Sequence, residues 1–203
     1  MNEPELQKAL DDIKVVREMI ERNRRATMES GSLFIWWGAL SLVAICLTYY
    51  FQSIGWYPQI GLIWGAFLIA GYAGTYSHIK KLTRSRPKNF IDRVIGATWF
   101  ACGISVIIFA FIAPPAGAFD WAYIPPMVTI ILAMGVFISS FLYDWRALSF
   151  TACLWWGGAL AMLFYEEGSL LIMGILVGCG MIALGLAAKT RQKREELAAD
   201  SSA

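Results

Sequence analysis

The side chains that could do chemistry in this chain are few, and their types and spacing do not form the sets that a reaction or a metal ion needs. His78 is the single histidine, so a bis-histidine haem site or a multi-histidine metal cluster is excluded. No Gly-x-Ser-x-Gly element accompanies it. The four cysteines lie inside apolar runs without a Cys-x-x-Cys spacing, and we expect them to pack as small apolar side chains: Cys46, Cys102, Cys153 and Cys179.

The carboxylates outside the polar ends flank the apolar runs and do not interrupt them: Asp92, Asp120, Asp144, Glu166 and Glu167. Proton-coupled pumps and voltage sensors depend on ionisable residues at mid-depth in the membrane, so this pattern disfavours both classes. A phosphate-binding Gly-x-x-x-x-Gly-Lys loop is absent from the sequence, and nothing predicts a cofactor. An enzyme would need lipid-interface chemistry by Asp92, Asp144 or Glu166, and we expect no enzymatic activity.

The tryptophans are the remaining candidates for binding chemistry. Trp155 and Trp156 follow Arg146 by about nine residues, roughly 13 Å along a helix at 1.5 Å per residue. That depth exceeds what an interfacial aromatic belt requires, so the pair either packs between helices or faces a ligand. Together with Trp99, they are the candidate ligand-facing residues.

Long uncharged segments position these side chains. The chain has 203 residues, of which 58% are hydrophobic and 16% charged. Each of six apolar segments is close to the ~20 residues that a helix needs to cross a bilayer. The sequence therefore predicts an all-α, polytopic membrane domain at 33–188, with spans at about 33–51, 59–79, 94–113, 124–143, 147–165 and 169–188.

The basic residues predict the orientation of these spans. All 17 Lys and Arg side chains fall at 8–25, 80–93, 146 and 189–194. The charged side chains of the loops on the opposite side are all carboxylates. By the positive-inside rule the N-terminal region 1–32, the tail 189–203 and both termini are expected in the cytoplasm. The six basic residues of the Lys80–Arg93 loop are expected to attract anionic lipids, and no nucleic-acid partner is predicted.

Ahead of the first span, the segment from about Pro4 to Met28 predicts one amphipathic helix. Its apolar stripe recurs at helical spacing and is formed by Leu6, Leu10, Ile13, Val16 and Ile20. Arg17 and Arg24 lie within the stripe, and Glu29–Ser32 interrupts the periodicity. This helix could pair with a second copy, lie on the membrane or bind a protein partner.

The odd spans share a tryptophan element, and the even spans carry small residues. Phe34-Ile-Trp-Trp-Gly38 resembles Leu154-Trp-Trp-Gly157, with a weaker echo at Trp99. Glycine rows such as Gly61-x-x-x-Gly65 permit close helix approach. We interpret this pattern as three two-span helical hairpins that run in the same direction.

These elements, together with Arg93-Val-Ile-Gly96 and the helix from Leu6 to Arg25, resemble a group of small bacterial six-span membrane proteins of uncharacterised function. The resemblance covers nearly the whole chain. It implies the same hairpin architecture and a location in the bacterial cytoplasmic membrane. It supplies no activity and no functional residue.

Two functions remain open from the sequence. The first is a non-catalytic scaffold or a regulatory or accessory subunit that acts through the cytoplasmic helix. The second is a carrier or binder of a small uncharged or lipid-like molecule. The shortage of polar groups at depth argues against the second, because a hydroxyl-rich solute would leave its own polar groups unsatisfied there.

Overall fold

The computed structural model describes residues 31–85 and 90–200, and helices connected by short turns make up that part of the chain. The described residues contain no strand. The predicted amphipathic helix and residues 86–89 of the basic loop lie outside them. The all-helical fold class is therefore confirmed.

Six of the described helices are long and apolar enough to cross a membrane. They are Gly31–Ser53, Pro58–Lys80, Phe90–Ile112, Trp121–Leu142, Arg146–Phe164 and Glu166–Arg191. Each overlaps one of the predicted segments. We call Gly31–Ser53 the first span and Glu166–Arg191 the last span.

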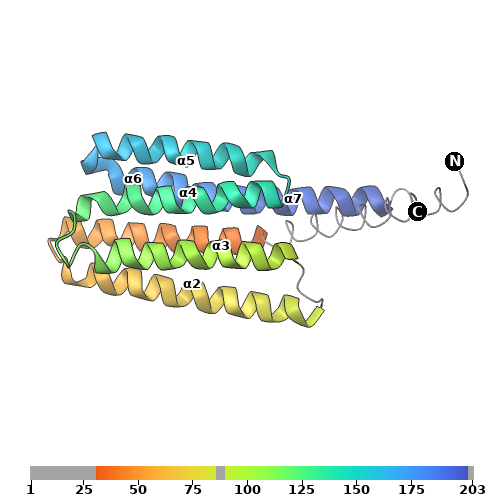
Figure 1. Ribbon diagram of the computed structural model, residues 1–203, viewed down its shortest axis with the longest axis horizontal. Coiled ribbons are helices and arrows are strands. Elements are labelled where there is room, and N and C mark those ends of the chain that lie inside the picture. The colour runs from red at the N-terminus through yellow and green to blue at the C-terminus, as the bar shows by residue number, and fades with distance from the viewer. Residues whose placement is uncertain (1–30, 86–89, 201–203) are drawn as a thin grey trace, which may run out of the picture.

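Figure 1 labels the helices that form the other spans. They are α2 (Pro58–Ser85), α3 (Phe90–Ile107) with a π-helical end at Ile108–Ile112, α4 (Ile124–Leu142) after a short 3₁₀ turn, and α5 (Arg146–Phe164). The last span comprises a 3₁₀ turn at Glu166–Gly168, α6 (Ser169–Met173), a π-helical segment (Gly174–Cys179) and most of α7 (Gly180–Asp200). Its ladder of hydrogen bonds is widened at the π segment.

The helices lie side by side in an elongated bundle, and α7 continues well past one end of it (Figure 1). The end of α2, the start of α3, the α4–α5 junction and the extension of α7 share that end. These are the places where the basic residues of the described chain occur. The connections at the other end carry Asp120, Glu166 and Glu167.

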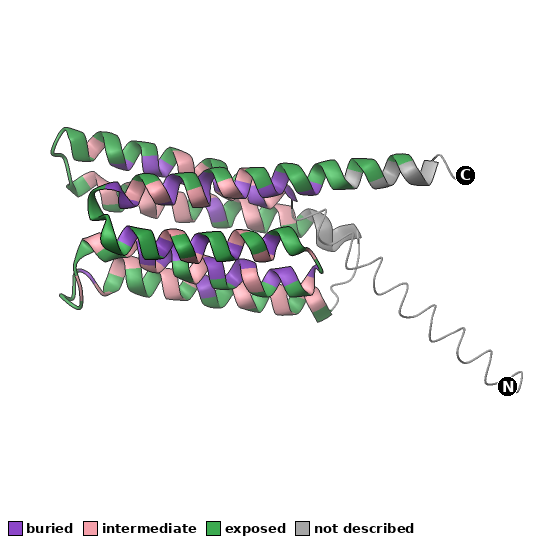
Figure 2. Cartoon of the chain, turned by 90° about the horizontal axis from the view of Figure 1, so that it is seen from above, coloured by how far each residue is buried: buried purple, intermediate pink, exposed green. Residues whose placement is uncertain are grey.

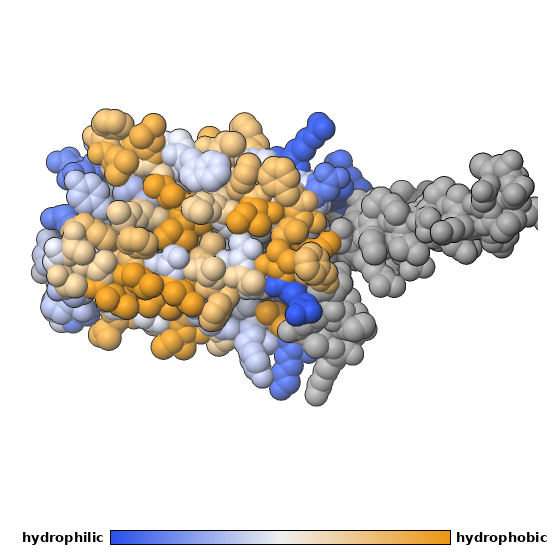
Figure 3. Space-filling model, in the orientation of Figure 1, coloured by the Kyte–Doolittle hydropathy of each residue, from blue (hydrophilic) through white to orange (hydrophobic). Residues whose placement is uncertain are grey.

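Burial separates central helices from peripheral ones. The first span, the fourth span and the last span have 39%, 44% and 39% of their most apolar window buried, whereas the α2 and α3 spans have 6% and 0%. Figure 2 shows the buried residues on the inner faces of the bundle, and Figure 3 shows apolar side chains over its outer surface. Such an outer surface suits lipid, because apolar patches of this extent are rare on soluble monomers.

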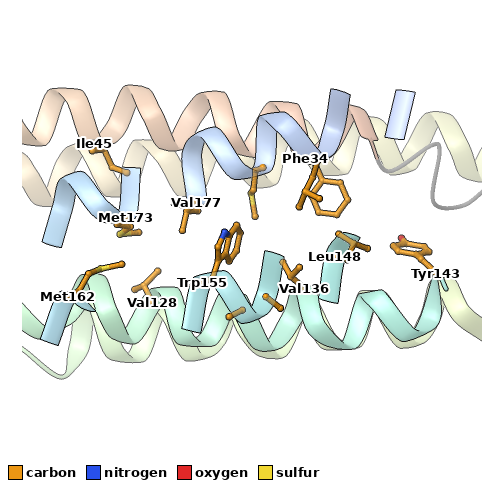
Figure 4. Close-up of a cluster of buried hydrophobic side chains, with 14 residues drawn as sticks. Phe34, Ile45, Val128, Val136, Tyr143, Leu148, Trp155, Met162, Met173 and Val177 are labelled. Atoms are coloured by element: carbon orange, nitrogen blue, oxygen red, sulfur yellow. The ribbon is translucent and has the colours of Figure 1, made fainter. Parts of the chain in front are cut away.

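The core lies where the first span, α4, α5 and the last span meet (Figure 4). Trp155 is its largest fully buried side chain, with no exposed surface. Phe34, Tyr143 and Leu148 gather at one end of the cluster, and Ile45, Met162 and Met173 at the other.

Hydrogen-bonded caps end the first span and α4 and allow short turns to follow them. After the first span, the Gly55 N–H donates to the Gln52 carbonyl (3.0 Å) and the Trp56 N–H to the Phe51 carbonyl (2.9 Å), with Gly55 at φ 71°. The α4–α5 junction repeats this pattern with a non-glycine residue: Asp144 has φ 47°, and the Trp145 N–H donates to the Ser140 carbonyl (3.0 Å). Both are Schellman caps, which satisfy the last carbonyls of a helix.

The start of α4 agrees with its sequence. Pro125 and Pro126 occupy its first turn, where a missing N–H leaves no hydrogen bond unmade. The first span is helical from Gly31, so Gly31 and Ser32 extend it past the predicted start at residue 33.

Candidate functional site

Ionisable side chains form no evident reactive cluster in the part of the chain that the structure describes. Within it, no group of three or more His, Cys, Asp and Glu side chains could hold a metal ion. His78 is half-buried near the end of α2, and both of its ring nitrogens lie 3.5 Å from the Ser32 hydroxyl of the first span. The histidine therefore faces another helix of the bundle.

Tryptophans of three helices lie against glycines of the helix that follows in sequence. Trp37 of the first span packs on Gly71 of α2, and its Nε1 donates to Thr75 Oγ1 at 3.0 Å. Trp36 lies against Gly74, one turn further along α2. A glycine is required at these positions because a Cβ would overlap the indole ring.

Looser tryptophan–glycine contacts occur in the other two helix pairs. A Cβ added at Gly135 of α4 would lie 3.5 Å from the Trp99 ring of α3. One added at Gly180, the first residue of α7, would lie 3.2 Å from Trp155 Nε1 of α5. In each of the three sequential pairs a tryptophan thus contacts a glycine of the following helix, and only in the first pair would a Cβ overlap the indole.

Trp155 differs from the other tryptophans in its polar atom. Its Nε1 is buried and has no hydrogen-bond partner among the described residues. Its ring reaches Gly180, directly after the π-helical segment Gly174–Cys179. A buried donor without an acceptor costs free energy, and such groups in native proteins call for an explanation.

The three candidate ligand-facing tryptophans do not meet at one place. Trp156 packs on Phe137, with ring centroids 5.2 Å apart, whereas Trp99 lies against Gly135. Positions 135 and 137 are about 200° apart around α4, so these two indoles lie on different sides of that helix. Trp155 points instead to the last span.

The sequence did not predict one close contact between two helices of the bundle. The first span and the last span run antiparallel with their backbones in contact. A Cβ added at Gly38 would lie 2.8 Å from the Gly178 carbonyl oxygen, and one added at Gly185 would lie 2.5 Å from the Gly31 carbonyl oxygen. We call these four residues the glycine seam.

A signal for the seam is present in the sequence. Gly31 and Gly38 are seven residues apart, as are Gly178 and Gly185. Two rows of glycine at heptad spacing bring two helices together along one line. Gly31 lies in the Glu29–Ser32 segment, which was expected to interrupt the helical periodicity, so this match was not recognised.

The predicted row at Gly61 and Gly65 behaves differently from the seam. No described atom lies within 4 Å of a Cβ added at either position. The same holds for Gly157, although it occupies the place of Gly38 in the Trp-Trp-Gly element. A small residue in a span therefore does not by itself mark a helix contact.

The seam positions the parts of the chain that leave the bundle. A Cβ added at Gly31 would lie 3.0 Å from Ala188 Cβ and 3.6 Å from Lys189 Cγ. From Lys189 onward, α7 presents exposed basic side chains, including Arg191, Lys193 and Arg194. Gly31, the first described residue, thus lies directly beside the base of the α7 extension.

The remaining predicted sites fall partly or wholly outside the described residues. Lys80 and Arg93, at the two ends of the basic loop, are both exposed. The stripe residues Leu6, Leu10, Ile13, Val16 and Ile20 all lie outside the described residues.

Comparisons with protein-family models, curated proteins and solved structures found no match to this chain.

Proposed function

We propose that this chain is a non-catalytic protein of the bacterial cytoplasmic membrane, a scaffold or accessory subunit that acts through its N-terminal amphipathic helix. The proposal rests on one observation: a segment with an apolar stripe precedes the first span, one of the central helices of the bundle. The backbone of that span is in contact with α7 at Gly31 and Gly185. A partner bound to the helix would thereby be tied to the membrane bundle.

The proposed topology has six spans in three hairpins, with both termini in the cytoplasm. The tryptophan–glycine contacts within each sequential pair support the hairpins. The gathering of the described basic residues at one end of the bundle supports the orientation, because positively charged loops are retained on the cytoplasmic side. In this orientation the Lys80–Arg93 loop faces the anionic inner leaflet.

The test is crosslinking of the full-length chain in native membranes. Changing Leu10, Ile13 and Val16 together to Glu places three charges on the stripe, and association with a partner or a second copy should then disappear. Unchanged crosslinking would contradict the proposal.

A matched control places three charges on the same helix outside the stripe. Gln7, Val15 and Met19 are changed together to Glu. Val15 is adjacent to Val16 but lies 100° away around a helix. This control variant should retain association, which separates loss of the stripe from a general effect of charge.

The alternative function, a carrier or binder of a small uncharged or lipid-like molecule, has one observation in its favour. The buried Trp155 Nε1 lacks an acceptor among the described residues, and a ligand oxygen could supply one. Native mass spectrometry of the protein in its own lipid distinguishes the two functions. Added mass equal to whole copies or another polypeptide supports the scaffold, whereas a monomer with one small reproducible adduct supports the carrier.

A further inference from the structure

The last span changes its hydrogen-bond pattern between its two ends. Gly174–Cys179 forms a π-helical segment, after which α7 begins at Gly180. At this transition the Gly180 N–H donates to the carbonyls of Ile175 and Val177. In a continuous α-helix it would donate to the Leu176 carbonyl, four residues back. The transition therefore takes from the Leu176 carbonyl its usual backbone donor.

Leu176 and Gly180 lie on the face of the last span that packs on α5. The Leu176 side chain is against Gly158 of α5, where an added Cβ would overlap it. Trp155, three residues earlier on α5, is against Gly180, where an added Cβ would lie 3.2 Å from the indole nitrogen. The carbonyls of a helix point along its axis toward later residues, so the Leu176 carbonyl points at Gly180. This carbonyl and the indole nitrogen thus meet beside Gly180.

The indole nitrogen of Trp155 supplies a hydrogen-bond donor at this place. It is on the edge of the ring that faces the last span (Figure 4), and it is buried without a hydrogen-bond partner among the described residues. A donor and an acceptor that adjoin without bonding to each other are both satisfied by one oxygen placed between them. Buried waters occupy such positions in proteins, with two to four polar partners.

We propose that one hydroxyl group binds at this position, accepting a hydrogen bond from Trp155 Nε1 and donating one to the Leu176 carbonyl. The oxygen must both accept and donate, so a water molecule or an alcohol fits the site. An ether, ester or ketone oxygen does not, because it leaves the Leu176 carbonyl without a donor. The chemistry of recognition is the same for the two sources of the hydroxyl.

Gly180 makes room for the hydroxyl, because it has no Cβ to stand beside the indole nitrogen. Gly158 and Gly180 are both half-buried, whereas Trp155 has no exposed surface. The site therefore lies just inside the outer surface of the bundle. A hydroxyl approaches it from the side, between α5 and the last span.

The site is independent of the proposed scaffold function, because none of its residues belongs to the N-terminal stripe. If the hydroxyl is that of an alcohol, this alcohol is the ligand of the alternative function, and the inference then rests on that function. If it is water, it is a fixed part of the contact between α5 and the last span.

Nuclear magnetic resonance of the full-length chain in lipid nanodiscs tests the site. The indole nitrogens are isotope-labelled, and the Trp155 signal is identified as the one that Trp155→Phe removes. We expect its proton at a hydrogen-bonded chemical shift, with a cross-relaxation peak to water or to an alcohol. Trp37 is the reference for that shift, because its Nε1 donates to Thr75 Oγ1 at 3.0 Å within the bundle.

Two alanine variants separate the site from a general effect of an added methyl. The methyl of Gly180→Ala stands against the Trp155 nitrogen, so it should abolish the cross-relaxation peak and move the indole proton to an unbonded shift. The control is Gly157→Ala, where no described atom lies within 4 Å of the added Cβ, and both signals should remain. The other indole signals show whether each variant is folded. If Gly180→Ala does not fold, the signals of the unaltered protein decide alone.

Each result has one interpretation. A peak to water identifies a bound water, whereas a peak to an alcohol, with a small adduct in native mass spectrometry, identifies a ligand. An unbonded shift in the unaltered protein overturns the proposal, as does a bonded shift with neither peak, because Nε1 then donates directly to the protein. A peak that survives in folded Gly180→Ala also overturns it. None of these results alters crosslinking through the stripe, so failure of this site is distinct from failure of the proposed function.

Discussion

Gly38 of the first span lies directly on the backbone of Gly178 in the last span, where a Cβ would stand 2.8 Å from the Gly178 carbonyl oxygen. This contact joins the beginning and the end of the membrane domain. It belongs to the glycine seam, which also brings Gly31 beside Ala188 and Lys189 at the base of the α7 extension.

Gly38→Ala should destabilise the bundle, whereas Gly157→Ala should stabilise it. The added methyl at Gly38 meets the Gly178 carbonyl and Ile182, and overpacking of this kind costs about 1–3 kcal/mol. No described atom lies near a Cβ at Gly157, so the substitution there gains the helix propensity of alanine, about 1 kcal/mol. Unfolding by denaturing detergent measures both, and equal effects at the two positions would contradict the seam.

Thr75→Val should weaken the contact between the first span and α2. The Trp37 Nε1 donor loses its acceptor 3.0 Å away, and hydrogen bonds between membrane helices average about 0.6 kcal/mol. A double-mutant cycle with Trp37→Phe isolates this energy. If the two effects simply add, the hydrogen bond contributes nothing to stability.

Trp155→Ala should lower the free energy of unfolding by about 3 kcal/mol. This is at the lower end for loss of a buried tryptophan, because the separated helices are solvated by lipid and not by water. Trp156 is only partly buried, so Trp156→Ala should cost less. Detergent unfolding gives the comparison. The carrier function adds one expectation: Trp155→Phe, which removes the unpartnered donor, would lower ligand affinity while the bundle stays folded.

Asp144→Gly should stabilise the α4–α5 junction. Asp144 adopts φ 47°, a conformation that costs roughly 1–2 kcal/mol for residues with a Cβ and nothing for glycine. Asp144→Val, whose branched side chain tolerates this region least, should destabilise the protein. Thermal unfolding in lipid nanodiscs orders the three proteins, and valine ranking above glycine would contradict the cap.

The sequence alone was sufficient for the number and type of the long helices. Backbone groups in a bilayer must be satisfied within the segment, so an apolar run of about twenty residues becomes a helix whatever packs on it. The positions of the basic residues along the sequence also predicted which span ends lie together at one end of the bundle.

Only the tertiary structure shows which small residues and which tryptophans form the contacts between helices. Gly38 and Gly157 follow the same Trp-Trp pair, yet one lies in the seam and the other meets no described atom. Trp155 is fully buried, whereas Trp156 is not. In water, a polar face shows which side of a helix points outward. Here lipid is as apolar as the core, so hydrophobicity along a span does not separate its lipid-facing side from its packed side.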